Sequence, residues 1–321
     1  MKAIRVHQFG DPDVMTCEDV PDLNPKPYQI LVEIKASGVN PVDVYIRSGS
    51  YGNKPSLPFT PGFDAAGLVK AIGKKVKKVK VGDRVYLADS VTGTYAQQAL
   101  CTETQVFPLS NKLSFEQGAG IYVPYTTAYF SLFNKAKARR GESVLVHGAS
   151  GAVGIAAVQL AKAAGLTVLA TAGSQKGLKL VKAQGADHVF DHYDPQYREK
   201  IEELTGDKRV DIILEMLADV NLGHDIGLIG LKGRIIVIGC RGPVEINPRR
   251  LMQQDAQVMG LSLFHLTPQE KMEIQKSLHK GFEKQELSPI VGQEYPLIKA
   301  AEAHRKVTSA GAYGKIILKS P

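Results

Sequence analysis

The first third of the chain alternates apolar and polar positions as β-strands do. The alternation is clearest at residues 2–9 and at residues 29–36, where Ile30, Val32 and Ile34 would share one face. Glycine and proline interrupt residues 38–67. Three further short strands are expected, at residues 67–72, 84–87 and 95–101. This pattern predicts an irregular, mainly antiparallel β domain.

From about Pro124, strand-like runs alternate with helical ones. Strands are expected at residues 144–147, 167–171, 188–190, 212–215, 234–238 and 258–264. Helices are expected between them at residues 152–164, 176–184 and 197–204, and near residues 222–229. Six strands joined by helical crossovers predict an α/β fold with a doubly wound parallel sheet of the Rossmann kind.

The last part of the chain is expected to return to the first domain. Thr267 and Pro268 are typical of a helix cap and first helical position, so a helix is expected at residues 269–284, and a strand at residues 315–319. We therefore expect a discontinuous domain over residues 1–124 and 266–321, with an inserted Rossmann domain over residues 125–265.

The turn after the first strand of the inserted domain contains a pattern that predicts ligand binding. It reads Ala149-x-Gly151-x-x-Gly154, the dinucleotide-binding pattern with alanine in place of the first glycine. Gly151 would let backbone amides approach a pyrophosphate, and Gly154 would let the helix pack closely. A buried βαβ unit without a ligand is the alternative interpretation.

The segment after the second strand indicates which dinucleotide binds. NAD-binding units place a carboxylate about 20 residues beyond the glycines, but residues 171–176 read Thr-Ala-Gly-Ser-Gln-Lys. Ser174 offers a hydroxyl and Lys176 a cation, which suit the 2′-phosphate of NADPH. The cofactor is therefore predicted to be NADPH. The alternative is that Ser174 only caps a helix.

Charge adds a second candidate surface. The net charge is +8, from 40 basic and 32 acidic residues, and six lysines lie within residues 70–80. They would attract an anion such as NADPH, acidic lipid or RNA. Alternatively, they form a solvated strand edge with Val76, Val79 and Val81 facing inward.

Other features exclude several classes. No run of about 18 apolar residues predicts a membrane span, and the start MKAIRVHQFG lacks the apolar core of a signal peptide, so a cytoplasmic location is expected. Cys17, Cys101 and Cys240 lie far apart, so they are expected to be free thiols without a disulfide framework or zinc lobe.

Motifs along nearly the whole chain resemble the zinc-free medium-chain dehydrogenase/reductase superfamily, most closely quinone oxidoreductases of the zeta-crystallin type. They lie at residues 38–43, 45–49, 60–64, 81–85, 146–154 and 245–249. The resemblance implies a GroES-like catalytic domain beside the Rossmann domain. It also implies an NADPH:quinone oxidoreductase that transfers one electron and is a homodimer or homotetramer.

The resemblance also indicates why zinc is not expected. Zinc-dependent relatives bind the metal through a cysteine near residues 38–40 and a histidine within the segment that matches residues 62–64. This chain has Asn40 and Phe63 there. An amide and a phenyl ring do not replace a thiolate and an imidazole as ligands, so no metal site is predicted.

The family's substrate cleft implies four catalytic candidates: Asn40, Tyr45, Tyr51 and Thr127. Asn40 would donate to a carbonyl, the tyrosines would stack on a flat quinone and donate to its oxygens, and Thr127 would orient the nicotinamide. Each is open to a structural interpretation, Asn40 as turn chemistry before Pro41. Cofactor positions carried over from the family are Tyr45, Thr127, Ser150, Gly151, Ala152, Val153, Gly173, Ser174, Lys176, His192, Asn221, Ile238, Gly239, Cys240, Arg241, Leu261, Ser262, Leu263, Phe264 and Lys315.

Two other functions stay open. The same cofactor geometry serves an enone or enoyl reductase, with Tyr45 or Tyr51 as proton donor. The resemblance also implies AU-rich RNA binding as a secondary activity, although the chain shows no RNP motif. The apolar strand expected at residues 258–264 would pair with a second copy in an oligomer.

Overall fold

The computed structural model describes residues 1–52 and 54–320, which form two compact units. Unit 1 contains Met1–Val123, Thr267–Ala310 and the chain from Gly314 onward. Unit 2 contains Pro124–Leu266 and Gly311–Tyr313. Residue 321, the expected end of the first domain, lies outside the described residues.

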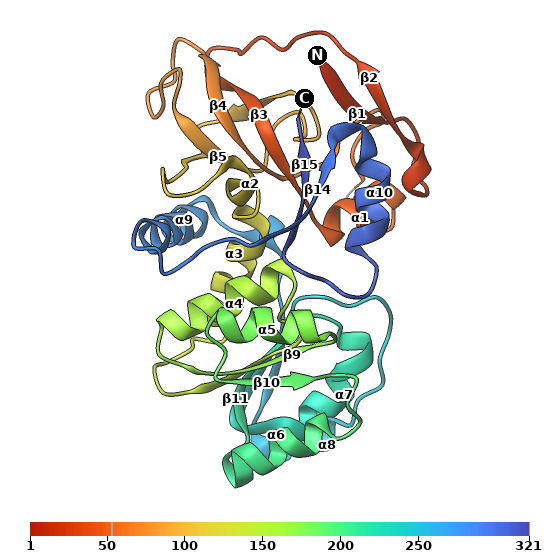
Figure 1. Cartoon of the computed structure of the whole chain (residues 1–321), viewed down its shortest axis with the longest axis vertical. Coiled ribbons are helices and arrows are strands. Elements are labelled where there is room, and N and C mark those ends of the chain that lie inside the picture. The colour runs from red at the N-terminus through yellow and green to blue at the C-terminus, as the bar shows by residue number, and fades with distance from the viewer. Residues whose placement is uncertain (53, 321) are drawn as a thin grey trace. The chain divides into compact units, whose positions relative to one another are not determined.

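Unit 2 is built on a parallel sheet of six strands (Figure 1). Its spatial order is β10-β9-β8-β11-β12-β13, which is 3-2-1-4-5-6 when the strands are counted along the chain. The strands are β8 (Ser143–Val146), β9 (Thr167–Ala172), β10 (His188–Asp191), β11 (Val210–Glu215), β12 (Ile229–Val237) and β13 (Gln257–Gly260). The predicted doubly wound sheet is confirmed, and the carboxyl ends of all six strands share one edge.

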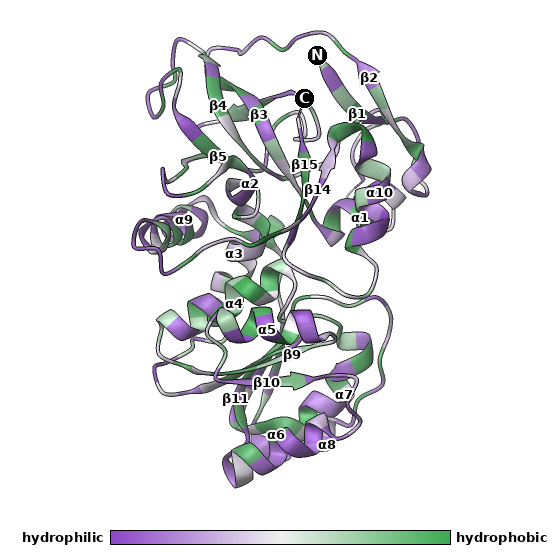
Figure 2. Ribbon diagram, in the orientation of Figure 1, coloured by the Kyte–Doolittle hydropathy of each residue, from purple (hydrophilic) through white to green (hydrophobic). Residues whose placement is uncertain are grey.

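Helices cover both faces of this sheet (Figure 1). They are α4 (Ala152–Ala163), α5 (Gln175–Ala183), α6 (Tyr197–Thr205), α7 (Ala218–Leu228) and α8 (Pro248–Gln254). Helix α4 packs on β8 and β9, and its residues from Gly154 to Ala161 are all buried. Its hydrophobic colour in Figure 2 reflects that position. A helix buried on most sides carries apolar residues all round.

The last strand of unit 2 is shorter than predicted. A strand was expected over residues 258–264, but β13 ends at Gly260 and Leu263–His265 forms a short 3-10 helix. Its partner β12 ends at Val237, which lies opposite Gly260. Beyond that point the apolar run has no neighbouring strand with which to pair, so the backbone turns away.

Unit 1 contains a sheet in the order β14-β15-β3-β4-β5-β7, with β6 also paired to β3. All these pairs are antiparallel except β14 with β15. The strands are β3 (Gln29–Val39), β4 (Asp64–Ile72), β5 (Arg84–Ala88), β6 (Gln98–Thr102), β7 (Val106–Pro108), β14 (Val291–Pro296) and β15 (Lys315–Lys319), and β1 (Lys2–Val6) pairs separately with β2 (Met15–Asp19). The expected mainly antiparallel architecture is confirmed.

Helices complete unit 1: α1 (Pro41–Ser48), α2 (Phe115–Gly118), α9 (Pro268–Glu283) and α10 (Ala300–Val307). Helix α3 (Tyr122–Tyr129) begins in unit 1 and continues into unit 2. Thr267 caps α9 by accepting from the Glu270 N–H at 3.2 Å, with Pro268 first in the helix, as the sequence predicted. The remaining short segments are 3-10 helices at Pro12–Val14, Gly206–Lys208 and Leu297–Lys299 and a π-helix at Phe130–Lys135.

The lysine-rich segment after β4 is a partly packed edge. Val76 and Val79 pack against the core of unit 1, as expected, but Val81 is 60% exposed, so its predicted inward orientation is wrong. All six lysines of residues 70–80 are exposed. Among the described helices, none combines the length and the apolar composition needed to cross a membrane.

Candidate functional site

Most residues predicted to bind the dinucleotide directly follow the six parallel strands of unit 2. Because these carboxyl ends share one edge of the sheet, the loops gather there, as in nucleotide-binding α/β proteins. The residues are Ser150 and Gly151 after β8, Gly173 and Ser174 after β9, His192 after β10, Ile238–Arg241 after β12 and Leu261–Phe264 after β13, and Asn221 lies in α7, the helix that follows β11. Ala152 and Val153 begin α4, and Lys176 lies in α5.

The turn between β8 and α4 has two glycines with different roles. A Cβ at Gly154 would lie 2.5 Å from Ala149 Cα, so only glycine lets the helix pack against the turn. A Cβ at Gly151 would meet Ala312 Cβ and Gly148 O at an ordinary 3.5 Å. The protein itself therefore does not require glycine at position 151. A glycine at this position before a helix N-terminus leaves the backbone uncovered, which fits the close approach of a phosphate.

The next loop fits a 2′-phosphate better than a pair of ribose hydroxyls. Ser174 Oγ accepts from the Gly177 N–H at 3.1 Å and caps α5, as the alternative interpretation proposed. Its hydroxyl still has a hydrogen to donate. Lys176 is exposed, and its Nζ lies 4.1 Å from the ring centroid of Tyr313. No carboxylate occurs at residues 172–176.

His192 lies against this loop. A Cβ at Gly173 would be 2.4 Å from His192 Nε2, so glycine is needed for the ring to pack there. Burial lowers the pKa of His192, which favours the neutral ring. The ring meets Tyr193 edge-on, with centroids 4.7 Å apart. A neutral ring at this position suits stacking better than pairing with a phosphate.

The loops after β11, β12 and β13 have their own internal contacts. Gly239 is required because a Cβ there would lie 2.3 Å from Met216 O, in the loop after β11. The Arg241 N–H donates to Asp219 Oδ1 at 2.9 Å. Ser150, on the first loop, donates to Ala312 O at 2.7 Å.

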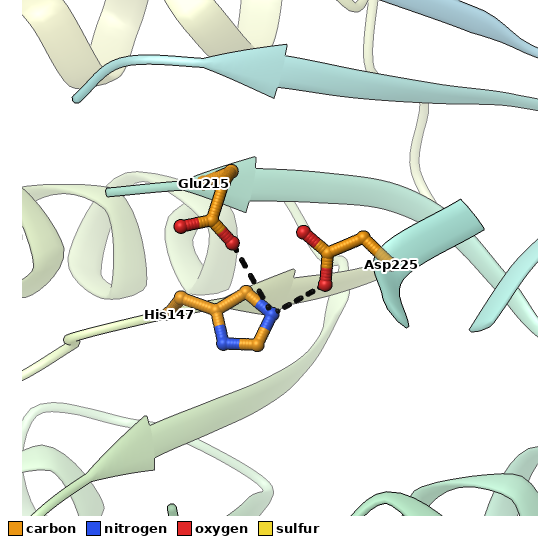
Figure 3. A group of neighbouring side chains, drawn as sticks. All are labelled: His147, Glu215 and Asp225. Atoms are coloured by element: carbon orange, nitrogen blue, oxygen red, sulfur yellow. Dashed lines mark hydrogen bonds and ion pairs between the residues drawn. The ribbon is translucent and has the colours of Figure 1, made fainter. Parts of the chain in front are cut away.

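A buried cluster that sequence reasoning missed lies behind this edge (Figure 3). His147 Nε2 is 2.9 Å from Asp225 Oδ1 and 3.6 Å from Glu215 Oε2. Glu215 Oε1 accepts from the Leu217 N–H and, at 3.2 Å, from Asn221 Nδ2, so it orders a predicted cofactor residue. The available signal was a polar residue ending a buried strand: His147 after β8 and Glu215 in β11.

Burial and neighbouring charges shift pKa values in this cluster. It raises the pKa of Glu215 to about 8, against the opposing effect of the His147 ring. Burial disfavours the charged His147 ring, but Asp225 and Glu215 outweigh it and raise the pKa of His147. The cluster therefore keeps protons at neutral pH.

The same three side chains are the group, among the described residues, with the ligand types and spacing of a metal site. Their ligand atoms lie within 4.8 Å of one another. However, 2.9 Å between His147 Nε2 and Asp225 Oδ1 is a hydrogen-bond distance. A hydrogen bond therefore accounts for the contact between His147 and Asp225.

In unit 1, Asn40 belongs to a second buried cluster. Its Nδ2 donates to Asp64 Oδ2 at 3.1 Å, and its Oδ1 accepts from Lys315 Nζ at 2.5 Å. Lys315 Nζ also lies 2.6 Å from Asp64 Oδ2. Lys315 was predicted by resemblance to be a cofactor residue, but its ammonium is buried in this ion pair, so that role is not carried further.

The cluster continues through Asp43, Tyr95 and His304. Asp43 Oδ2 accepts from the Asn40 N–H at 2.8 Å and from the Tyr95 hydroxyl at 3.0 Å, which lies 3.2 Å from His304 Nε2. Burial raises the pKa of Asp43 to about 7 and lowers the pKa of His304 to about 3. Sequence reasoning missed these residues because their partners are far apart in the chain.

The two candidate tyrosines lie close to Asn40 in the chain. Tyr45 is in α1, which Asn40 precedes, and the Tyr51 N–H donates to Tyr45 O at 3.2 Å. Both tyrosines are partly exposed. Thr127 is buried in the part of α3 that belongs to unit 2. The structure thus groups Asn40, Tyr45 and Tyr51 in one short segment.

Comparisons with known proteins agree with this architecture. Residues 26–128 match the alcohol dehydrogenase GroES-like domain, and residues 152–279 match the zinc-binding dehydrogenase family. A quinone oxidoreductase of Rattus norvegicus is 49% identical over 99% of this chain and 97% of its own length. The Escherichia coli quinone oxidoreductase complexed with NADPH has a TM-score of 0.87 and 30% identity, covering 99% of this chain and 100% of its own. An NAD-dependent alcohol dehydrogenase has a TM-score of 0.92 and 28% identity, covering 99% of each chain.

The residues of unit 1 do not fit a catalytic zinc. Phe63 offers no ligand atom, and the oxygen of Asn40 accepts from an ammonium group at 2.5 Å. A second cation beside Lys315 would be repelled. The chemistry of this chain is therefore derived without a metal.

Proposed function

Because this chain belongs to the quinone oxidoreductase family of the medium-chain dehydrogenases/reductases, we propose that it is a zinc-independent NADPH:quinone oxidoreductase. The observation that carries the proposal is the turn between β8 and α4. Gly154 is needed there for packing and Gly151 is not, so the space over Gly151 is kept for a phosphate. The adjoining loop offers Ser174 and Lys176 without a carboxylate, which favours NADPH.

Residues of unit 2 would hold and orient the cofactor. The α4 N-terminus binds the pyrophosphate, Ser174 and Lys176 bind the 2′-phosphate, and Asn221 is oriented by Glu215. When bound, NADPH supplies the reducing equivalents.

Residues of unit 1 would hold the acceptor. Asn40 Nδ2 donates to a quinone oxygen, so it stabilises the negative charge that develops there during reduction. Tyr45 and Tyr51 pack on the flat ring and donate from their hydroxyls. The protein therefore contributes positioning and hydrogen bonds.

A substrate panel tests this function. Steady-state rates with NADPH are compared for quinones, alkenals and enoyl thioesters. We expect the highest kcat/KM with a quinone. A higher value for an alkenal or enoyl thioester would instead assign the chain as an enone or enoyl reductase. EPR during turnover of an ortho-quinone tests the one-electron course, and a purely two-electron product without a radical signal would contradict it.

Lys176→Ala tests the cofactor assignment. We expect kcat/KM for NADPH to fall about tenfold, because one charge-assisted contact to the 2′-phosphate is lost, with no change for NADH. Lys182→Ala, in the last turn of the same helix, is the matched control and should leave both values unchanged. A preference of the unmodified protein for NADH would overturn the assignment.

A further inference from the structure

We propose that Lys315 and Asp64 are positioning residues for quinone reduction, because they fix the Asn40 carboxamide with one N–H directed to the substrate. The inference rests on the proposed function, which gives Asn40 its contact with the quinone. Neither residue touches the substrate in this proposal.

The contacts determine the orientation of the carboxamide. Lys315 only donates, so it selects the oxygen of Asn40, and the Asp64 carboxylate only accepts, so it selects the nitrogen. Rotating the carboxamide by a half turn would place N–H groups against the ammonium and the carbonyl oxygen against the carboxylate. Two attractive contacts would become repulsive ones, and the rotation is therefore prevented.

This orientation leaves one donor of Asn40 available. A carboxamide nitrogen carries two hydrogens. Within the described residues, Nδ2 makes one hydrogen bond, to Asp64 Oδ2 at 3.1 Å. The second hydrogen is the group that would meet a quinone oxygen.

The ion pair is too deeply buried to be explained by stability alone. Lys315 is 2% exposed, Asp64 0% and Asn40 3%. Removing two charges from water costs about as much as their attraction returns, and an apolar pair of similar volume is often equally stable. A role in holding Asn40 gives a reason for charges at this position.

The surrounding chain is built to admit the lysine. Gly38 lies opposite Asp64 in the pairing of β3 with β4 and opposite Ile317 in the pairing of β3 with β15. A Cβ at Gly38 would be 2.1 Å from Ala119 O, 2.5 Å from Lys315 Cε and 2.9 Å from Asp64 Cβ, so glycine is needed there for the backbone as well as for the lysine. The Val123 N–H holds the other oxygen of Asp64 at 2.8 Å. Both positioning side chains are therefore fixed themselves.

The test uses a double variant, because Lys315→Met alone leaves Asp64 as an unpaired buried charge that threatens folding. Asp64→Asn combined with Lys315→Met is neutral and keeps an oxygen for the Val123 N–H. We expect its kcat/KM for the quinone to fall about tenfold, with the Kd for NADPH, measured by nucleotide fluorescence, unchanged. Lys319→Met, an exposed lysine on the same strand, is the control and should match the unmodified enzyme.

The decisive measurement adds Asn40→Ala to both backgrounds. If the two residues act through Asn40, Asn40→Ala lowers kcat/KM in the unmodified enzyme and causes no further loss in the double variant. Equal losses in both backgrounds would overturn the positioning role and leave the proposed function intact. No loss in the unmodified enzyme would overturn the role of Asn40 itself, and with it this inference.

Discussion

The ionisable side chains of His147, Glu215 and Asp225 share one buried site in unit 2. The protons that they bind contribute to folding stability. Burial raises the pKa of Glu215 from 4.5 to about 8. Between these values the folded protein binds a proton that the unfolded chain has released. The stabilisation from this group is therefore complete below about pH 4.5 and is lost as pH rises through about 8.

Glu215→Gln should remove this dependence. Glutamine keeps the oxygen that accepts from Leu217 and Asn221, and its amide replaces the carboxylic proton. Between pH 5.5 and 8.5 the unmodified protein should lose stability relative to the variant, by at most about 1.4 kcal/mol per pH unit. The measurement is Tm or urea unfolding across that range.

Glu203→Gln, an exposed residue of α6, is the matched control and should follow the unmodified protein at every pH. Asp43 also has a raised pKa and loses stabilisation as pH rises, but it is present in all three proteins and cancels in the difference. Glu215 contributes to the raised pKa of His147, so Glu215→Gln also lowers the pKa of His147, and the difference reports these two coupled groups together. Parallel curves for Glu215→Gln and the unmodified protein would contradict the assignment.

Two residues show what could be predicted from the sequence and what could not. Gly154 was predicted to serve close packing, and the structure confirms that a Cβ there would collide with Ala149. Lys315 was assigned to the cofactor by resemblance to the family, but in the structure its side chain is buried beside Asp64. Its partner Asp64 is 251 positions away, and only the folded sheet brings them together.

At the scale of elements, the β8–α4 turn has one glycine that serves packing, Gly154, and one that we assign to binding, Gly151. Gly154→Ala should lower stability by about 1–3 kcal/mol, because the added methyl group has no room beside Ala149. Gly151→Ala should cost less than about 1 kcal/mol, since its Cβ meets only ordinary contacts, but it should weaken NADPH binding by filling the phosphate space.

Thermal unfolding and NADPH titration of the two variants provide the comparison. The expected result is a low Tm for Gly154→Ala and a raised Kd with nearly unchanged Tm for Gly151→Ala. If Gly151→Ala bound NADPH with normal affinity, that result would contradict phosphate binding at this turn.

Helices and strands could be predicted from the sequence where the local apolar pattern and the pairing with a neighbouring strand give the same element. The alternation of strands and helices from β8 to β12 was visible in the apolar runs, since β8, β9 and β11 are largely buried in a parallel sheet. The strand expected over residues 258–264 was too long because its end depends on where β12 stops. Helix α1 was missed because the prolines and glycines around it predict turns, although Asn40, Pro41 and Asp43 are typical of a helix start.

At the scale of the whole molecule, the family predicted from the motifs is confirmed by relatives that match nearly the full chain. Identity of fold does not determine the acceptor, because an NAD-dependent alcohol dehydrogenase shares the architecture. Substrate and cofactor choice must therefore be argued from side chains, and in our proposal Asn40 and Phe63 bear on the metal and Lys176 on the cofactor. The exposed lysines of residues 70–80 could attract RNA or other polyanions nonspecifically. Mobility-shift assays at physiological salt would measure that binding.

The oligomer predicted from the sequence would form through the edge strand β13. It pairs with β12 on one side and ends the sheet of unit 2 on the other, so it offers backbone groups to a second copy. Gly260 closes this strand, and a Cβ there would meet nothing within 4 Å. Gly260→Lys should therefore leave the fold intact and place two like charges near a twofold edge, converting an oligomer into monomers in light scattering. Gly260→Ala, the control, should stay oligomeric, and a monomeric unmodified protein would refute pairing through β13.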